Sequence, residues 1–326
     1  MPTVMYASLF WCAALSLQPG TTTAARGFTA GTFLAFHVAF GIFISAATEL
    51  SNTLIDALDI TVLWRRAKPI IEAAPEIDAR KEDPGRLTGA LALDHVSFRY
   101  QPQGRLILDD VSLHAAPGEF IALVGPSGSG KSTIYRLLLG FESPESGAIT
   151  YDDQDLARLN VYAIRRQIGI VLQHARIMAA SMFENIVSNR SIGMDEAMEA
   201  ARAAGLAEDI TRLPMGMFTM LSEGGTNLSG GQRQRLLIAR ALACQPRLLL
   251  FDEATSALDN RTQAIVRESL NALQVTRVVI AHRLSTIRQA DRIYVLEHGR
   301  VVQQGSFDEL ARHEGLFARL MARQTA

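Results

Sequence analysis

The residues with the clearest chemistry form a glycine-rich run behind a short apolar segment. The segment FIALV is followed by Gly125, Pro126, Ser127, Gly128, Ser129, Gly130, Lys131, Ser132 and Thr133. This run, the P-loop, matches G-x-x-x-x-G-K-[ST], in which glycines let backbone N–H groups turn inward around phosphate oxygens. Lys131 would bring positive charge to the β and γ phosphates, and Ser132 would ligate Mg²⁺. A strand, a loop and a helix must position such a cradle, which predicts a nucleotide-binding site.

Two acidic residues follow a second apolar run, where a buried strand would end. Residues 248–251 precede Asp252 and Glu253, and α/β sheets place ligand chemistry at the carboxyl ends of their strands. Asp252 would hold Mg²⁺ directly or through water, and Glu253 would orient or deprotonate the attacking water. The alternative is a solvated acidic pair, against which the P-loop in the same chain argues. His282 follows the run TRVVIA in the same way. A functional role for this histidine is supported only by the presence of the other motifs.

Strand-like and helix-like stretches alternate from residue 91 onward. The expected strands are LALDHVSFRY, EFIALVG, QIGIVLQ, RLLLFDE and TRVVIAH, and helices are expected from Lys131 and Ser229. Apolar strands separated by helices predict an α/β fold with a largely parallel sheet, in which the early strands form an antiparallel edge.

A pentapeptide then connects these motifs with one family. Leu228, Ser229, Gly230, Gly231 and Gln232 form LSGGQ, followed by RQRLLIARAL and LLLFDEATSALD. The sequence from residue 91 to 326 therefore resembles the nucleotide-binding domain of ABC transporters, of which LSGGQ is the signature. The resemblance implies a P-loop domain with a parallel core sheet, an antiparallel edge sheet and a helical subdomain. It also implies ATP and Mg²⁺ as cofactors.

The resemblance assigns roles to single residues by matching position. Tyr100 would stack on adenine, Gln173 would sense Mg²⁺ and the attacking water, and Asp259 would communicate between two sites. Glu253 matches the catalytic position and His282 the contact to the γ-phosphate, which implies a hydrolysis-competent ATPase. The expected catalytic set is thus Lys131, Gln173, Glu253 and His282, and the expected Mg²⁺ ligands are Ser132, Gln173 and Asp252.

The division of these parts implies a partner. Ser229 and Gly231 resemble the residues that close over the γ-phosphate held by the P-loop of a second domain. One domain would therefore build half of each active site, and two subunits, alike or different, would dimerise head to tail around two ATP molecules. Loss of the bridging γ-phosphate on hydrolysis would reopen the dimer and move the attached membrane helices.

Composition excludes other classes of protein. The 326 residues include 32 basic and 33 acidic side chains, a net charge of -1, whereas nucleic-acid binding usually shows as a strong basic excess or patch. We therefore expect no nucleic-acid partner. The two cysteines are too few for a disulfide framework or a zinc site.

Charge is distributed unevenly along the chain. Up to Thr48 the one charged side chain is Arg26, and residues 28–48 contain no Asp, Glu, Lys or Arg. That length matches the ~20 residues that span a bilayer, so we expect a transmembrane helix there. Residues 4–17 form a shorter, marginal span, which would complete a transmembrane hairpin. His37, inside the longer span, has two interpretations, a polar contact in a translocation path or packing against a neighbouring helix.

The domain boundaries follow from these patterns. Residues 1–72 would form a partial transmembrane domain whose helix continues into the cytoplasm to about residue 72. Residues 73–90 would be a linker, because prolines and mixed charges interrupt the pattern. Residues 91–326 would form the ABC ATP-binding domain, placed in the cytoplasm by the basic residues 65, 66 and 68 after the span.

Membrane spans that precede the ATPase in one polypeptide resemble ABC exporters. We therefore expect a multi-pass protein of the cell membrane, in contact with lipid. QIGIVLQHARIMAASMFENI, LPMGM, LSEGG and SALDNRTQ are similar to ATPase-permease subunits of the NHLM type, which implies export of a peptide or bacteriocin. Many exporters have a Gly-Glu pair where this chain has SEGG, so the coupling role of Glu223 would involve a shifted partner.

The number of spans leaves three hypotheses, because exporters of the family have more spans per subunit than this sequence contains. The chain is the C-terminal portion of an exporter subunit, or additional transmembrane helices come from a partner, or it is a membrane-anchored ATPase with a regulatory role. An inactive truncated fragment belongs to the first hypothesis.

Overall fold

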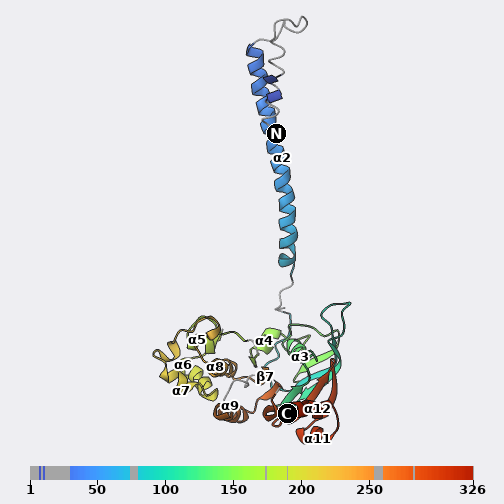
Figure 1. The fold of residues 1–326 in the computed structure, drawn as a ribbon, viewed down its shortest axis with the longest axis vertical. Coiled ribbons are helices and arrows are strands. Elements are labelled where there is room, and N and C mark those ends of the chain that lie inside the picture. The colour runs from blue at the N-terminus through green and yellow to red at the C-terminus, as the bar shows by residue number, and fades with distance from the viewer. Residues whose placement is uncertain are drawn as a thin grey trace. The chain divides into compact units, whose positions relative to one another are not determined.

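A computed structural model of the chain describes residues 7, 8, 10, 11, 30–73, 80–172, 175–188, 190–252, 260–281 and 283–325. The chain divides into two compact units, Met1–Glu76 and Ile77–Ala326. Figure 1 shows the long helix of the first unit and the α/β domain of the second.

The first unit contains helix α2, Ala30–Ile71, of 42 residues. At 1.5 Å per residue it is about 63 Å long, twice the ~30 Å of the hydrocarbon core. Within the described part of the chain, it is the one helix that could cross a membrane by length and composition. Of the marginal span 4–17, the structure describes four residues, so the hairpin remains a prediction.

Aromatic rings surround His37 in this unit. The His37 ring lies 5.7 Å from the Phe10 ring and 6.3 Å from the Phe33 ring, between centroids. Phe10 and Phe33 also meet edge to face at 5.6 Å. These contacts favour the packing interpretation of His37.

Two sheets form the second unit. The six-stranded sheet has the order β10-β9-β3-β8-β7-β6, in which β9, β3, β8, β7 and β6 are parallel and β10 is antiparallel to β9. Its strands are β3 (Phe120–Val124), β6 (Ile168–Val171), β7 (Leu248–Asp252), β8 (Thr276–Ile280), β9 (Arg292–Glu297) and β10 (Arg300–Gly305). The four-stranded antiparallel sheet has the order β2-β1-β4-β5, from β1 (Leu91–Phe98), β2 (Leu108–Ala115), β4 (Ser146–Tyr151) and β5 (Gln154–Asp155). The predicted parallel core and antiparallel edge sheet are confirmed.

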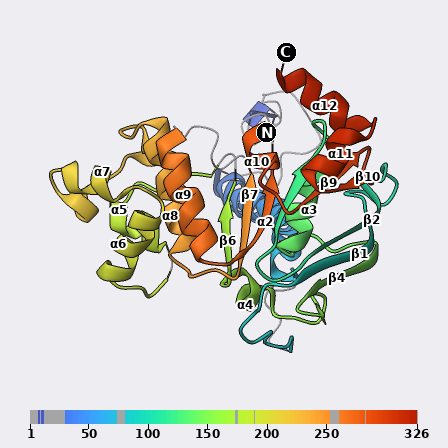
Figure 2. The same cartoon turned by 90° about the horizontal axis from the view of Figure 1, so that it is seen from below.

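The helices gather in separate places. The helical part contains α5 (Met182–Val187), α6 (Met194–Ala203), α7 (Ala207–Arg212), η1 (Gly216–Phe218), η2 (Glu223–Gly225) and α8 (Gly230–Leu242). The remaining helices are α3 (Lys131–Leu138), α4 (Val161–Arg165), α9 (Asn260–Ala272), α10 (Leu284–Ile287), α11 (Phe307–Arg312) and α12 (Leu316–Thr325). Figure 2 shows α5–α8 on one side of the six-stranded sheet, and β1, β2 and β4 on the opposite side. The predicted helical subdomain is therefore present.

Alternation along the central strands creates two hydrophobic cores. Leu248, Leu250, Val278 and Ile280 face the cluster that also contains α3 and the antiparallel sheet. Their neighbours, such as Leu249 and Phe251, face the cluster that contains α5, α6 and α8. Because successive side chains of a strand point to opposite faces, the sheet is buried on both sides and α3 lies between the two sheets.

Residues 80–90 lie in the range expected to be a linker, but they belong to the second unit and are tied to the rest of it by several hydrogen bonds. Asp152 accepts hydrogen bonds from the Thr88 N–H and hydroxyl, both at 2.6 Å, and from the N–H groups of Gly89 and Ala90 at 3.2 and 2.9 Å. Gln167 accepts one from the Leu87 N–H at 2.9 Å. Asp152 itself has a φ of 48°, in the left-handed region, which Asp tolerates better than most residues.

Asp152→Ala should destabilise the second unit by about 1–3 kcal/mol, because three backbone N–H groups lose their acceptor. For a domain of this size, the melting temperature should fall by about 2–12 °C, measured by circular dichroism on the full chain in detergent. Asp153→Ala is the matched control: its φ of 63° is also left-handed, but the bonds to Thr88, Gly89 and Ala90 remain. An equal loss in both variants would contradict the role of these bonds.

Candidate nucleotide-binding site

The P-loop joins β3 to α3, and its last glycine is required by both conformation and space. Gly130 has a φ of 106°, and a Cβ at this position would lie 2.6 Å from Leu108 Cδ2 and 3.2 Å from the Ile107 oxygen. A larger residue would be strained at this φ and would force the Leu108 side chain to move. α3 begins at Lys131, so the N–H groups of its first turn face the loop, as in anion sites at helix N-termini.

Lys131 is held inside the loop. The residue is 7% exposed, and its Nζ donates to the oxygens of Gly125 and Pro126 at 2.8 and 2.9 Å. Ser129 Oγ lies at 3.4 Å. A buried ammonium group requires such acceptors. The loop therefore holds a cation among oxygen atoms that a phosphate group can replace, and these residues fit the phosphates of a nucleotide.

Ser132 and Asp252 lie at the same edge of the core sheet. Ser132 is exposed in the first turn of α3 and Asp252 is half-buried at the end of β7. β8 separates β3 from β7, and all three run parallel. Among the residues that the structure describes, no group of three or more His, Cys, Asp or Glu forms a metal cage. Mg²⁺ commonly binds through one or two protein oxygens together with phosphate and water, so this pair fits Mg²⁺ brought by a nucleotide.

Tyr100 lies beside the P-loop helix. Its hydroxyl oxygen is 3.2 Å from Thr133 Oγ1, and its ring is in edge contact with Phe98 at 4.9 Å between centroids. Half of its surface is exposed. The Arg136 guanidinium lies over the ring at 5.9 Å from its centroid, and the exposed part of the ring is close to the phosphate cradle, where a base could stack.

Four predicted residues lie outside the described parts of the chain: Gln173, Glu253, Asp259 and His282. The strands that lead to three of them end side by side, because β6, β7 and β8 are parallel neighbours. Their roles remain predictions.

The signature, residues 228–232, starts helix α8. Ser229 Oγ accepts a hydrogen bond from the Gln232 N–H at 3.2 Å, and Gln232 Oε1 accepts one from the Ser229 N–H at 2.9 Å. This reciprocal pair is a capping box, which fixes the first turn of a helix. Leu228 is buried, whereas Ser229 and Gly230 are exposed and Gly231 is half-buried. α8 packs mainly on α5, α6 and β6, whereas the P-loop leads into α3, so one chain keeps the signature and the P-loop on different elements.

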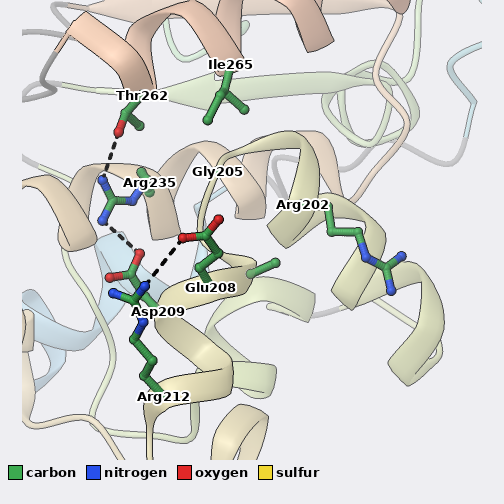
Figure 3. A pocket seen from close by; sticks show the side chains of 9 residues that line it. Arg202, Gly205, Glu208, Asp209, Arg212, Arg235, Thr262 and Ile265 are labelled. Carbon is green, nitrogen blue, oxygen red and sulfur yellow. Dashed lines mark hydrogen bonds and ion pairs between the residues drawn. The ribbon is translucent and has the colours of Figure 1, made fainter.

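Sequence reasoning missed a polar network behind the signature. Gln232 Nε2 donates to Asp209 Oδ1 at 2.9 Å, and Arg235 Nη2 donates to Asp209 Oδ2 at 2.8 Å. Arg235 Nη1 also lies 3.3 Å from Thr262 Oγ1 on α9. Figure 3 shows Arg235 between Asp209 and Thr262, at a cavity of about 430 Å³. The spacing of Gln232 and Arg235, three residues apart on one helix face, was the available signal.

Comparisons with known proteins agree with this geometry. The family model described as ABC transporter matches residues 108–256, which contain the P-loop and the signature. Over 307 residues, the chain is 41% identical to the cyclolysin secretion/processing ATP-binding protein CyaB of Bordetella pertussis, an alignment that covers 93% of this chain and 43% of the relative. Over 294 residues, it is 37% identical to the alpha-hemolysin translocation ATP-binding protein HlyB of Escherichia coli O157:H7, covering 89% and 42%.

A solved structure gives the same likeness. The structure of a bacterial Atm1-family ABC exporter with ATP bound is 39% identical, with a TM-score of 0.76, and the match covers 83% of this chain and 47% of that one. The chain spans less than half the length of these relatives.

Lys131→Ala should weaken binding of ATP by at least about tenfold, because charge-assisted hydrogen bonds to phosphate are lost. Binding of a fluorescent ATP analogue to the full chain in detergent measures the effect. Lys81→Ala, which removes a lysine outside the P-loop, should leave the affinity unchanged. Equal affinities in the two variants would exclude the P-loop as the phosphate site.

Asp209→Asn should destabilise the second unit by about 1–3 kcal/mol, because it places an amide donor against the largely buried Arg235 guanidinium. The side chains of Arg235 and Asp209 are 12% and 21% exposed, whereas those of Arg212 and Glu208 in the neighbouring ion pair are 78% and 74% exposed. Glu208→Gln is therefore the matched control and should leave the melting temperature unchanged. A similar loss in both variants would show that the network behind the signature contributes nothing beyond surface charge.

Proposed function

Because the chain belongs to the ABC transporter family through its ATP-binding domain, we propose that it hydrolyses ATP and couples this reaction to export across a membrane. One observation carries the proposal: the cradle around Lys131 and the exposed signature at the start of α8 occur in a single domain with the predicted fold. The reaction needs phosphate positioning and electrostatic stabilisation, which such a cradle supplies.

The residues divide the chemistry among them. Lys131 and the first N–H groups of α3 bind the phosphates, and the half-exposed ring of Tyr100 stacks on the base. Ser132 and Asp252 hold Mg²⁺, with Gln173 as a further ligand. When bound, Mg²⁺ neutralises negative charge that develops on the phosphate oxygens. Glu253 accepts a proton from the attacking water, and His282 contacts the γ-phosphate.

A second ABC subunit completes each site. Ser229 and Gly230 are exposed in the single chain, and in the proposed head-to-tail dimer they cover the nucleotide that the partner holds. Hydrolysis then removes the phosphate that connects the two subunits, and the dimer opens. Homodimers and heterodimers are equally compatible with this arrangement.

The proposed cargo is a polypeptide. The relatives are named for cyclolysin secretion and alpha-hemolysin translocation, and the segments that resemble NHLM-type subunits favour a peptide or bacteriocin. The proposed location is the cell membrane, as part of a multi-pass assembly, with α2 in the lipid and the ATPase domain in the cytoplasm. Additional transmembrane helices come from a fuller chain or a partner.

Glu253→Gln should abolish ATP turnover and trap ATP-bound dimers, because the variant lacks the proton acceptor. In a background without Cys12 and Cys244, the additional pair Ser127→Cys and Ser229→Cys should then form disulfides between subunits when Mg-ATP is added. Ser127 and Ser229 are both exposed. Non-reducing electrophoresis measures the dimer, and phosphate release measures turnover.

The control pair is Ser127→Cys with Ser112→Cys, since Ser112 is also exposed but lies on β2 of the antiparallel sheet. It should give no ATP-dependent dimer. Unchanged turnover in Glu253→Gln would refute the proposed base, and cross-linking that ignores ATP would refute the head-to-tail arrangement.

A further inference from the structure

The hydroxyl of Tyr135, on the P-loop helix α3, is buried among apolar side chains. Tyr135 is 2% exposed and lies in the cluster between the two sheets. Residues of this cluster on β7 and β8 are aliphatic, including Leu248, Leu250, Val278 and Ile280. A hydroxyl at such a position is stable only if it finds hydrogen-bond partners.

Its partners belong to the two strands next to the site. Tyr135 Oη lies 2.8 Å from the Phe251 oxygen and 2.6 Å from the Val278 oxygen, with one proton to share between these acceptors. It also accepts a hydrogen bond from the Ile280 N–H at 3.1 Å. A single hydroxyl therefore contacts the backbone of both β7 and β8.

These backbone groups lie directly before the polar ends of the strands. The Phe251 carbonyl is part of the peptide unit that leads into Asp252, and Ile280 stands two residues before His282. Tyr135 is on the same helix as Lys131 and Ser132, one turn from the P-loop. Displacement of α3 relative to β7 would therefore break these bonds.

Burial favours the protonated form of the hydroxyl. Burial raises the pKa of Tyr135 well above its ordinary value, and the negative charge of Asp252 adds to the effect. Both causes disfavour the phenolate. Tyr135 is thus a permanent donor to the strand carbonyls.

We propose that Tyr135 is a positioning residue for magnesium nucleotide. Its hydroxyl holds the ends of β7 and β8 at a fixed distance from α3, so that Asp252 and Ser132 can bind one Mg²⁺ together. The inference rests on the proposed ATP-binding function. It assigns no chemical step to Tyr135 itself.

The chain offers a matched control in a second buried tyrosine. Tyr151 on β4 is 1% exposed, and its hydroxyl donates to the Leu138 oxygen at the end of α3, at 2.6 Å. Tyr135→Phe removes a buried hydroxyl on α3, and Tyr151→Phe removes a buried hydroxyl that donates to α3. Only the first removes contacts to β7 and β8.

Two measurements on the full chain in detergent separate positioning from general stability. The first is the affinity for a fluorescent ATP analogue with Mg²⁺ and with EDTA. Tyr135→Phe should reduce the gain in affinity due to Mg²⁺ by about threefold to tenfold, the worth of one hydrogen bond, and change the EDTA value less than about twofold. Tyr151→Phe should change neither value.

The second measurement is amide hydrogen exchange of nucleotide-free protein. Tyr135→Phe should speed exchange in residues 276–281 by about tenfold, because the Ile280 N–H loses an acceptor. Tyr151→Phe should leave this segment unchanged. An intact Mg²⁺ gain in Tyr135→Phe, or equal losses in both variants, would overturn the proposal.

Failure of the proposed function gives a different result. If the wild-type chain binds no nucleotide, the proposed ATPase is wrong and the role of Tyr135 for magnesium nucleotide fails with it, whereas hydrogen exchange still tests the link between α3 and the strands. Faster exchange at residues 276–281 in Tyr135→Phe alone then supports the link between α3 and the strands, and unchanged exchange overturns it.

Discussion

Helix α3 is held between two sheets of different construction, and the position of its first turn depends on both. Leu250 and Ile280 of the parallel sheet and Leu108 of the antiparallel sheet lie in the same buried cluster as the side chains of α3. Gly130 lets the loop approach Leu108 without a side chain between them. Because interiors are close-packed, a shift on either side would move α3 as a whole. The direction of the N–H groups in the first turn of α3 follows from this packing rather than from the loop alone.

Contiguous parts of the site could be predicted from sequence, because local pattern and chemistry coincide there. The run from Gly125 to Thr133 follows the end of β3 directly and includes the first residues of α3. Asp252 follows a strand whose apolar composition indicates burial on both faces. The signature includes its own capping box, formed by Ser229 and Gln232. In each case the residues that determine the structure are within a few positions of one another.

Contacts between distant segments could not be read in this way. The Tyr135 hydroxyl meets carbonyls 116 and 143 residues further along the chain, and helical periodicity places Tyr135 only on a buried face. The Asp152 carboxylate accepts hydrogen bonds from residues 88–90, and no spacing rule identifies this pairing in the sequence. Prolines and charges predict a linker for residues 73–90, but hydrogen bonds to Asp152 and Gln167 tie residues 85–90 to the domain. Tertiary partners, not composition, decide such cases.

The chemistry of Ser229 explains why a serine suits the start of α8. Aspartate caps helices as well as serine does, but its carboxylate would repel the phosphate of a partner's nucleotide. The Ser229 oxygen accepts the Gln232 N–H, and this bond uses a lone pair and leaves the hydroxyl proton free to donate. The same side chain can thus stabilise its own helix and, in the proposed dimer, donate to an anion in front of it. Because the positive end of the helix dipole points the same way, the first turn of α8 attracts negative charge before any partner residue contributes.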